Sequence, residues 1–80
     1  MPTVINERGF QFRIYTRDHP PAHVHVWHQG YEAIIEFRDE IVIRDGDRRF
    51  SRRDIARMIE IIEVNRQYLI EEWRKIHEQV

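Results

Sequence analysis

Two consecutive prolines, Pro20 and Pro21, restrict the fold of this chain more than any other feature of its sequence. A proline has no backbone N–H and its ring fixes φ, so neither a helix nor a central strand continues through this pair. Strict alternation follows from His23 to Trp27, with Val24 and Val26 as the apolar members. A period of two predicts a strand with one buried face. The chain therefore passes from a loop directly into a strand, and four of its five histidines lie in or beside that junction.

Similar patterns predict further strands on both sides of this junction. The segment Phe10–Tyr15 alternates, residues 3–5 and 41–43 consist of β-branched residues, and residues 31–38 return as the next strand after the turn at 29–30. Turns that contain glycine separate these segments at residues 7–9, 29–30 and 45–47. We therefore expect a small, mainly antiparallel sheet of four to five strands within about residues 3–50. The tandem pair Ile34-Ile35 leaves open which of the two faces the core.

The pattern changes after Ser51, where apolar residues recur at steps of three and four, as in an amphipathic helix. Ser51 and Asp54 have the spacing of a capping box. No proline or glycine follows, so we predict one long helix over about residues 52–79, packed on the sheet in an α+β fold. At about 1.5 Å per residue this helix would be about 42 Å long, whereas a domain of this size is roughly 30 Å across. It therefore either overshoots the sheet or bends near Asn65.

Length and composition limit the partners and the location of the protein. Eighty residues, 41% hydrophobic and 34% charged, suit a single globular domain over residues 1–80. A helix that overshoots its sheet leaves an apolar face uncovered, so we expect a homodimer or a small protein partner. The net charge of −1 argues against duplex DNA, although twelve arginines leave a local contact with RNA open. The sequence contains neither an apolar run of membrane-spanning length nor a signal peptide, so we expect a cytoplasmic protein.

Side-chain parity predicts which residues share the sheet face that points away from the helix. The buried face is assigned to five apolar residues: Phe10, Phe12, Ile14, Val24 and Val26. The opposite face then combines imidazoles, a guanidinium, aromatic groups and carboxylates, from Arg13, Tyr15, His23, His25, Trp27, Glu32, Ile34 and Glu36. This face is the predicted working surface.

One hypothesis for this surface is RNA cleavage without a metal ion. Such chemistry needs a base, an acid and a cation for the phosphate. His23 and His25 can exchange protons near neutral pH. Arg13 would hold the phosphate, and Tyr15 or Trp27 would stack on a base.

A second hypothesis is metal binding. Two histidines at positions i and i+2 of a strand can share an ion, so His23 and His25 are the ligands if a metal binds, with His19 or His28 completing the site. Glu36 is a further candidate ligand. Only two ligands fall firmly on one face, so the sequence predicts no cofactor.

Two further hypotheses involve no chemistry at the histidines. In the first, the protein is an interaction module whose binding surface comprises Trp27, Ile34, Glu36 and His19, together with the apolar stripe of the helix. In the second, the histidines only pack and hydrogen-bond to the backbone.

Several segments resemble a known family. They are Met1-Pro2-Thr3, Gly9-Phe10, the histidine-proline run from His19 to Val26, Phe50-Ser51-Arg52-Arg53, and Asn65 to Leu69 with Trp73. Over nearly its whole length the chain resembles the small prokaryotic family known as domain of unknown function 4160, which has no established activity. The resemblance implies a cytoplasmic component of a toxin–antitoxin-like pair with a protein partner, and it favours RNA as the target.

Overall fold

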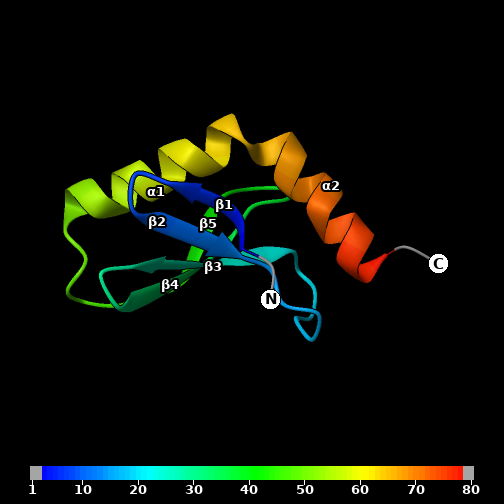
Figure 1. Ribbon diagram of the computed structural model, residues 1–80, viewed down its shortest axis with the longest axis horizontal. Helices are drawn as coiled ribbons and strands as arrows, with labels where there is room; N and C mark the ends of the chain where they lie inside the picture. Colours follow the sequence, from blue (N-terminus) through cyan, green and yellow to red (C-terminus); the bar gives the residue numbers. More distant parts are fainter. Residues whose placement is uncertain (1–2, 79–80) are drawn as a thin grey trace.

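The computed structural model describes residues 3–78, which form a five-stranded antiparallel sheet followed by two helices (Figure 1). The strands are β1 (Thr3–Glu7), β2 (Phe10–Arg13), β3 (His23–His28), β4 (Tyr31–Glu36) and β5 (Val42–Gly46). The helices are α1 (Arg52–Val64) and α2 (Arg66–His77). The strands pair in sequence order, each antiparallel to its neighbours. The predicted α+β class and its antiparallel sheet are confirmed.

Two tight turns set the register of the first four strands. Arg8 and Gly9 join β1 to β2 with φ of 54° and 83°, and Gln29 and Gly30 join β3 to β4 with φ of 52° and 83°. Positive φ at both central residues is typical of a type I′ turn, whose twist matches that of the flanking strands. Glycine tolerates this conformation, which explains its place in both hairpins.

The ends of all five strands differ from the sequence prediction. β1 continues to Glu7 rather than residue 5, and β3 continues to His28 rather than Trp27. β2 ends at Arg13 rather than at Tyr15, because the N–H of Tyr15 bonds to the side chain of Asp18 instead of to a strand. β4 ends at residue 36 rather than 38, and β5 covers residues 42–46 rather than 41–43.

The register separates a buried face from an open one. Phe12 pairs with Val26, and Val26 pairs with Ala33; all three side chains are fully buried. Ile35 is also fully buried, whereas Ile34 lies on the open face opposite His25. This settles which isoleucine of the tandem faces the core. The helices complete the core with Met58, Ile61, Ile62, Leu69 and Trp73.

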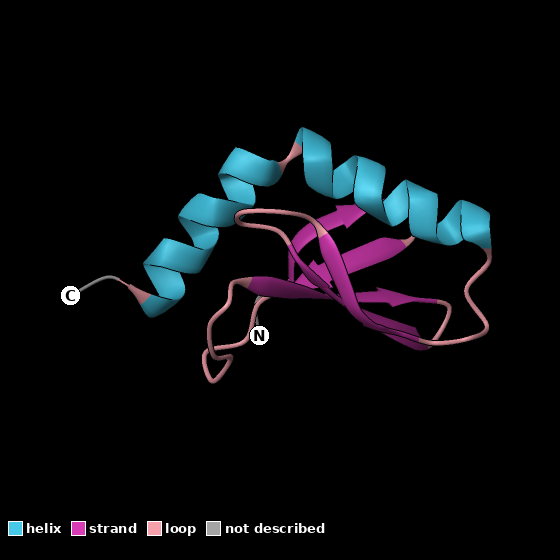
Figure 2. Cartoon of the chain, turned by 180° about the vertical axis from the view of Figure 1, so that it is seen from behind, coloured by secondary structure: helices cyan, strands magenta, loops and turns pink. Residues whose placement is uncertain are grey.

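The helical segment bends at Asn65, so it forms two helices where the sequence predicted one. Ser51 caps α1 through the predicted capping box with Asp54. At the bend, both the backbone N–H and the side-chain Nδ2 of Asn65 bond to the carbonyl oxygen of Ile61, at 3.1 and 2.8 Å. Figure 2 shows α1 over one face of the sheet and α2 descending past the end of the sheet. The predicted helix end at residue 79 lies outside the described residues.

An arginine explains why the chain turns here. The guanidinium of Arg66 donates to the carbonyl oxygens of Phe37, Arg38 and Asp39, which follow β4. This attachment directs Leu69 and Trp73 into the core, where they are 0% and 2% exposed. Of the two outcomes that the helix length allowed, the bend is the one that occurs. Within residues 3–78, no helix is both long and apolar enough to cross a membrane.

Candidate functional site

Strand β3 and the loop before it bring three side chains with metal-ligating groups together. Nε2 of His25 lies 3.0 Å from Oδ1 of Asp18, and Nε2 of His23 lies 3.5 Å from the same oxygen. Each of the three residues offers a ligand atom within 4.8 Å of the others. His23 and His25 share a side of the strand because they are two residues apart. We call Asp18, His23 and His25 the His/Asp cluster.

The second ring nitrogen of each histidine is held by an acceptor. Nδ1 of His23 lies 2.9 Å from the carbonyl oxygen of Pro21, and Nδ1 of His25 lies 2.8 Å from Oε2 of Glu32. A carbonyl oxygen can only accept, so Nδ1 of His23 donates, and Nε2 of the neutral ring has a free lone pair. His25 lies between two acceptors, because Oδ1 of Asp18 faces its Nε2 at 3.0 Å and Glu32 faces its Nδ1, so its ring donates to one carboxylate or to both. Only Nε2 of His23 faces Asp18 as an acceptor.

Asp18 is held in the same way by a tight turn. Its backbone N–H donates to the carbonyl oxygen of Tyr15 at 3.1 Å, and its Oδ2 accepts from the N–H of Tyr15 at 2.9 Å. The remaining oxygen, Oδ1, faces the two histidines. In each of the three side chains, the polar atom that points away from the cluster is held by a hydrogen bond, and this bond fixes the direction of the atom that points into the cluster.

This arrangement leaves the centre of the cluster short of positive charge. With His23 neutral, its Nε2 lone pair faces the carboxylate oxygen of Asp18, and two carboxylates, Asp18 and Glu32, flank His25, so a cation at this point is favourable. A metal ion would supply that cation. A second proton on His25 would do so too, because an imidazolium can donate to Asp18 and Glu32 together.

Aromatic side chains cover the cluster. The ring of His23 packs against Trp73 of α2 with 5.6 Å between centroids, and His23 is only 4% exposed. The ring of Tyr15 meets the ring of His25 edge-on at 4.6 Å. The side chains of His25 and Asp18 are 14% and 11% exposed. Contact with α2 thus shields His23, while part of the cluster stays open to solvent.

Arg13 and Trp27 lie beside the cluster on the open face. Arg13 pairs with His25 across β2 and β3, and Gln11 pairs with Trp27. The guanidinium carbon of Arg13 lies 5.3 Å from the centroid of the Trp27 ring, and Nη2 donates to Gln11. The parity prediction for these residues holds, and the side chains form a cation–π pair.

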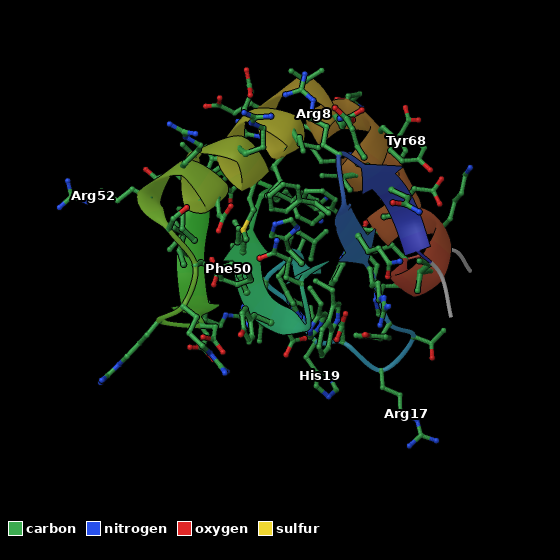
Figure 3. The ribbon with its side chains drawn as sticks, turned by 60° about the vertical axis from the view of Figure 1, so that its left-hand side comes forward. Arg8, Arg17, His19, Phe50, Arg52 and Tyr68 are labelled. Atoms are coloured by element: carbon green, nitrogen blue, oxygen red, sulfur yellow. The ribbon has the colours of Figure 1, made fainter. Side chains whose placement is uncertain are left out.

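Two of the predicted histidines do not join His23 and His25. His19 is exposed, and Figure 3 shows it pointing away from the protein on the loop, as Arg17 does. His28 stacks on Phe10 at 3.9 Å, and its Nδ1 lies 2.9 Å from the carbonyl oxygen of Gly9. Neither residue therefore completes the site that the sequence assigned to it.

The other predicted surface residues lie on the far side of β3. Glu36 pairs with His23 across the sheet, but its Oε2 accepts from Nε and Nη2 of Arg44 at 3.1 and 3.0 Å. Ile34 is half-buried opposite His25. Glu36 is thus engaged elsewhere and does not reach the His/Asp cluster as a third ligand.

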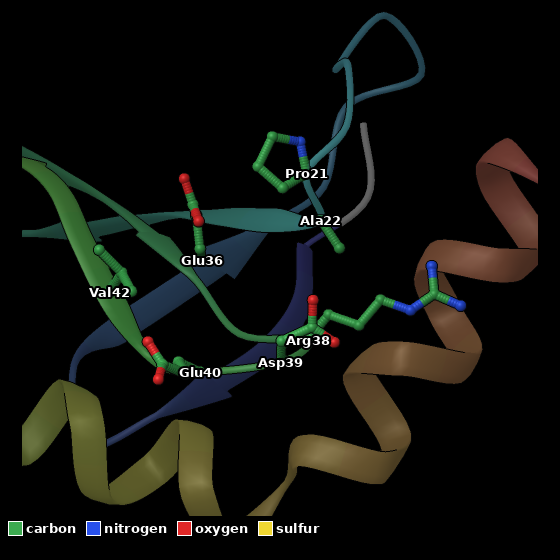
Figure 4. Close-up of a pocket in the computed structure, with 7 residues that line it drawn as sticks. All are labelled: Pro21, Ala22, Glu36, Arg38, Asp39, Glu40 and Val42. Atoms are coloured by element: carbon green, nitrogen blue, oxygen red, sulfur yellow. The ribbon is translucent and has the colours of Figure 1, made fainter.

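A hollow of about 350 Å³ is lined by residues just before β3, at the end of β4, in the following loop and at the start of β5, and none of the three cluster residues lines it (Figure 4). Of its acidic residues, Glu36 bonds to Arg44, while the lining cation Arg38 bonds to Glu78 outside the lining at 2.7 Å. Two lining residues contact or pair with His23, namely Pro21 through its carbonyl oxygen and Glu36 through the strand register. The lining residues are Pro21, Ala22, Glu36, Arg38, Asp39, Glu40 and Val42.

Sequence reasoning missed Asp18 as a partner of the histidines. Parity places strand residues only, and Asp18 reaches the face from a loop whose path depends on its turn with Tyr15. Parity did place Glu32 on this face, but gave it no role. An acidic residue shortly before the alternating histidines was the one available signal.

Comparison with known proteins gives a family and no characterised relative. Residues 9–74 match the model of a family described as "Domain of unknown function (DUF4160)". Neither the curated proteins nor the solved structures give a match.

Proposed function

The chain belongs to the DUF4160 family of unknown function, and for this member we propose that Asp18, His23 and His25 bind a divalent transition-metal ion. The proposal rests on one observation. Three potential ligand atoms converge, while the second polar atom of each ligand is held by Pro21, Glu32 or the backbone of Tyr15.

The spacing of the cluster suits such an ion. Zinc binds histidine nitrogen at about 2.0–2.1 Å, so ligand atoms at tetrahedral angles lie about 3.3 Å apart. The two distances to Oδ1 of Asp18, 3.0 and 3.5 Å, lie on either side of that value. Metal-bound histidines usually donate their other N–H to a carboxylate or a backbone carbonyl. Glu32 and Pro21 supply one of each.

The ligand set indicates which metals fit and what they would do. Two imidazoles and one carboxylate suit zinc or ferrous iron, and three protein ligands leave a coordination position open. A metal with an open position activates a bound water molecule or polarises a phosphoryl or carbonyl oxygen. This proposal departs from the sequence-based expectation of no cofactor. Side-chain parity placed only two ligands on one face, and Asp18 supplies the third from the loop.

Metal analysis of untagged protein tests the proposal. We expect about one zinc or iron per chain after loading and dialysis, and d–d absorption bands of low-symmetry cobalt after Co²⁺ substitution. The variants Asp18→Ala and His25→Ala should lose the metal, while His19→Ala, a change in the neighbouring loop, should keep it. The proposal fails if the wild type binds no stoichiometric metal, or if His19→Ala loses it as His25→Ala does.

The second candidate is metal-free RNA cleavage by a toxin–antitoxin-like protein. The observation in its favour is that His25 lies between two carboxylates, 3.0 Å from Asp18 and 2.8 Å from Glu32. An imidazolium in that position is a charged donor that can exchange protons with a substrate. Cleavage of a short RNA that persists in excess EDTA and disappears in His25→Ala would favour this candidate. Cleavage that requires added metal would favour the metal site.

A further inference from the structure

We propose that the ligand of this metal site is a phosphate ester, and that Arg13, supported by Trp27, binds its phosphate group. The inference rests on the proposed metal site and adds the chemical class of the ligand. Three features of the open face support it: among the described residues, Arg13 has no counter-charge and a buried donor of Trp27 has no acceptor, and a metal would balance the charge around the cluster.

Arg13 is an oriented cation without an acidic partner in the part of the chain that the structure describes. Its guanidinium lies over the ring of Trp27 and donates to Gln11, and it forms no ion pair with any residue in the range 3–78. Arg38, Arg44 and Arg49, by contrast, each bond to a carboxylate. A guanidinium that is half-buried, stacked and unpaired is poised to bind an oxyanion in a bidentate manner.

Trp27 adds an unsatisfied donor next to this cation. The indole Nε1 is buried and has no hydrogen-bond partner among the residues that the structure describes. A buried N–H normally has an acceptor, and an unpaired one calls for an explanation. The guanidinium of Arg13 lies over the same ring, so the cation and the unsatisfied donor lie side by side on the open face.

The charge balance makes the anion dependent on the metal. The carboxylates of Asp18 and Glu32 contribute two negative charges around His25. A divalent ion would balance them and leave the charge of Arg13 in excess, which attracts an anion. Arg13 and His25 are a register pair on neighbouring strands, whose backbones lie about 4.8 Å apart. A phosphate group directs oxygens in several directions, so it can contact the metal with one oxygen and present others to the guanidinium.

Binding to zinc-loaded protein, measured by calorimetry, tests this inference. The probes are inorganic phosphate, uridine monophosphate, the dinucleotide UpU and acetate. We expect phosphate and at least one nucleotide to bind, and acetate to bind at least tenfold more weakly. Arg13→Gln should weaken phosphate binding at least tenfold without changing the zinc content, and Arg13→Lys should recover part of the loss. Arg17→Gln, a matched change at an outward-pointing arginine, should have no effect.

The outcomes separate the two proposals. If the wild type and Arg13→Gln bind phosphate equally, the proposed role of Arg13 is wrong. It is also wrong if acetate binds as tightly as phosphate. Neither result contradicts the metal site. Absence of zinc from the wild type overturns the metal site and, with it, the metal-dependent part of this inference. Tighter binding of UpU than of uridine monophosphate identifies an RNA strand as the source of the phosphate, and the reverse order identifies a free nucleotide.

Discussion

Glu32 has the position of a residue that tunes a metal ligand without touching the metal. Its Oε2 holds Nδ1 of His25 at 2.8 Å. Removing such a partner lowers metal affinity by about 10–100-fold. We therefore expect Glu32→Gln to weaken zinc binding by about that factor in a competition titration with a chromophoric chelator.

Glu36→Gln is the matched control for this prediction. Glu36 lies on the same strand and the same face, but bonds to Arg44 instead of a histidine. We expect it to leave zinc affinity unchanged. Equal losses in the two variants would show that general negative charge, rather than the bond to His25, sets the affinity.

A second prediction concerns Asp47 and Arg49, which lie in the loop that follows β5. Side-chain hydrogen bonds from Arg49 lower the pKa of Asp47 from the ordinary value of 3.8 to about 2, and the backbone N–H of Arg49 acts in the same direction. A lowered pKa means that the pair stabilises the folded state above about pH 3.8 and that this contribution is lost as the pH falls towards 2.

Titration of the Asp47 carboxyl carbon by NMR checks this value. Arg49→Gln should return the pKa of Asp47 towards 3.8. Arg48→Gln, which changes the neighbouring exposed arginine, should leave it near 2. A pKa of Asp47 that stays near 2 in Arg49→Gln would rule out Arg49 as the cause.

At the residue scale, the sequence correctly predicted the positions of side chains on strands and failed to predict those of side chains in the loop before β3. Alternation placed Arg13, His25 and Trp27 on one face because a strand has a fixed period of two. It placed neither Asp18 beside the histidines nor His19 away from them. Those positions depend on the turn that Asp18 makes with Tyr15, a contact that no period encodes.

At the scale of elements, the attachment of α2 to the end of the sheet governs the site. Arg66 donates to three carbonyl oxygens after β4, and Trp73 of the same helix packs on His23 and Phe37. The amphipathic period predicted a helix throughout, and the length argument predicted a bend as one of two outcomes. The direction of the bend depends on the carbonyl groups that Arg66 meets, which lie 27–29 residues away in sequence.

Arg66→Ala should therefore destabilise the protein. Hydrogen bonds to a charged group contribute about 1.5–3 kcal/mol each. The bond from Arg66 to Asp39 is exposed and contributes less than the other two. We therefore expect a loss of roughly 2–4 kcal/mol in the free energy of unfolding. Urea denaturation followed by circular dichroism measures it.

Arg74→Ala is the control on the same helix. Arg74 is exposed, and its side chain forms no hydrogen bond or ion pair among the described residues, so its loss should change stability by no more than about 0.5 kcal/mol. If both variants unfold at the same urea concentration as the wild type, the three carbonyl contacts do not hold α2 in place.

At the scale of the whole molecule, the bend removes the reason for which a homodimer was expected. Leu69 and Trp73 belong to the apolar stripe that was to overshoot the sheet, and both are buried within the chain. The free edge at β5 has features that oppose strand pairing, since its register shifts beside Ile35 and it contains the charged residues Arg44 and Asp45. A homodimer or a protein partner stays a prediction, and the exposed large hydrophobic side chains that could serve it are Val42 and Ile43 on β5 and Val64 and Tyr68 on the helical segment.

Metal binding and folding should be coupled across the whole molecule, because the ligands come together only in the folded state. Asp18 reaches the histidines through its loop, and His23 is held by Trp73 of α2. An ion that binds only the folded state, and whose free concentration is 100 times its dissociation constant, stabilises that state by about 2.7 kcal/mol.

For a domain of this size, this corresponds to a rise in Tm of roughly 10–20 °C. We expect this rise in zinc-titrated thermal melts of the wild type and of His19→Ala, and its absence in His25→Ala. An equal rise in His25→Ala would place the bound zinc outside the His/Asp cluster.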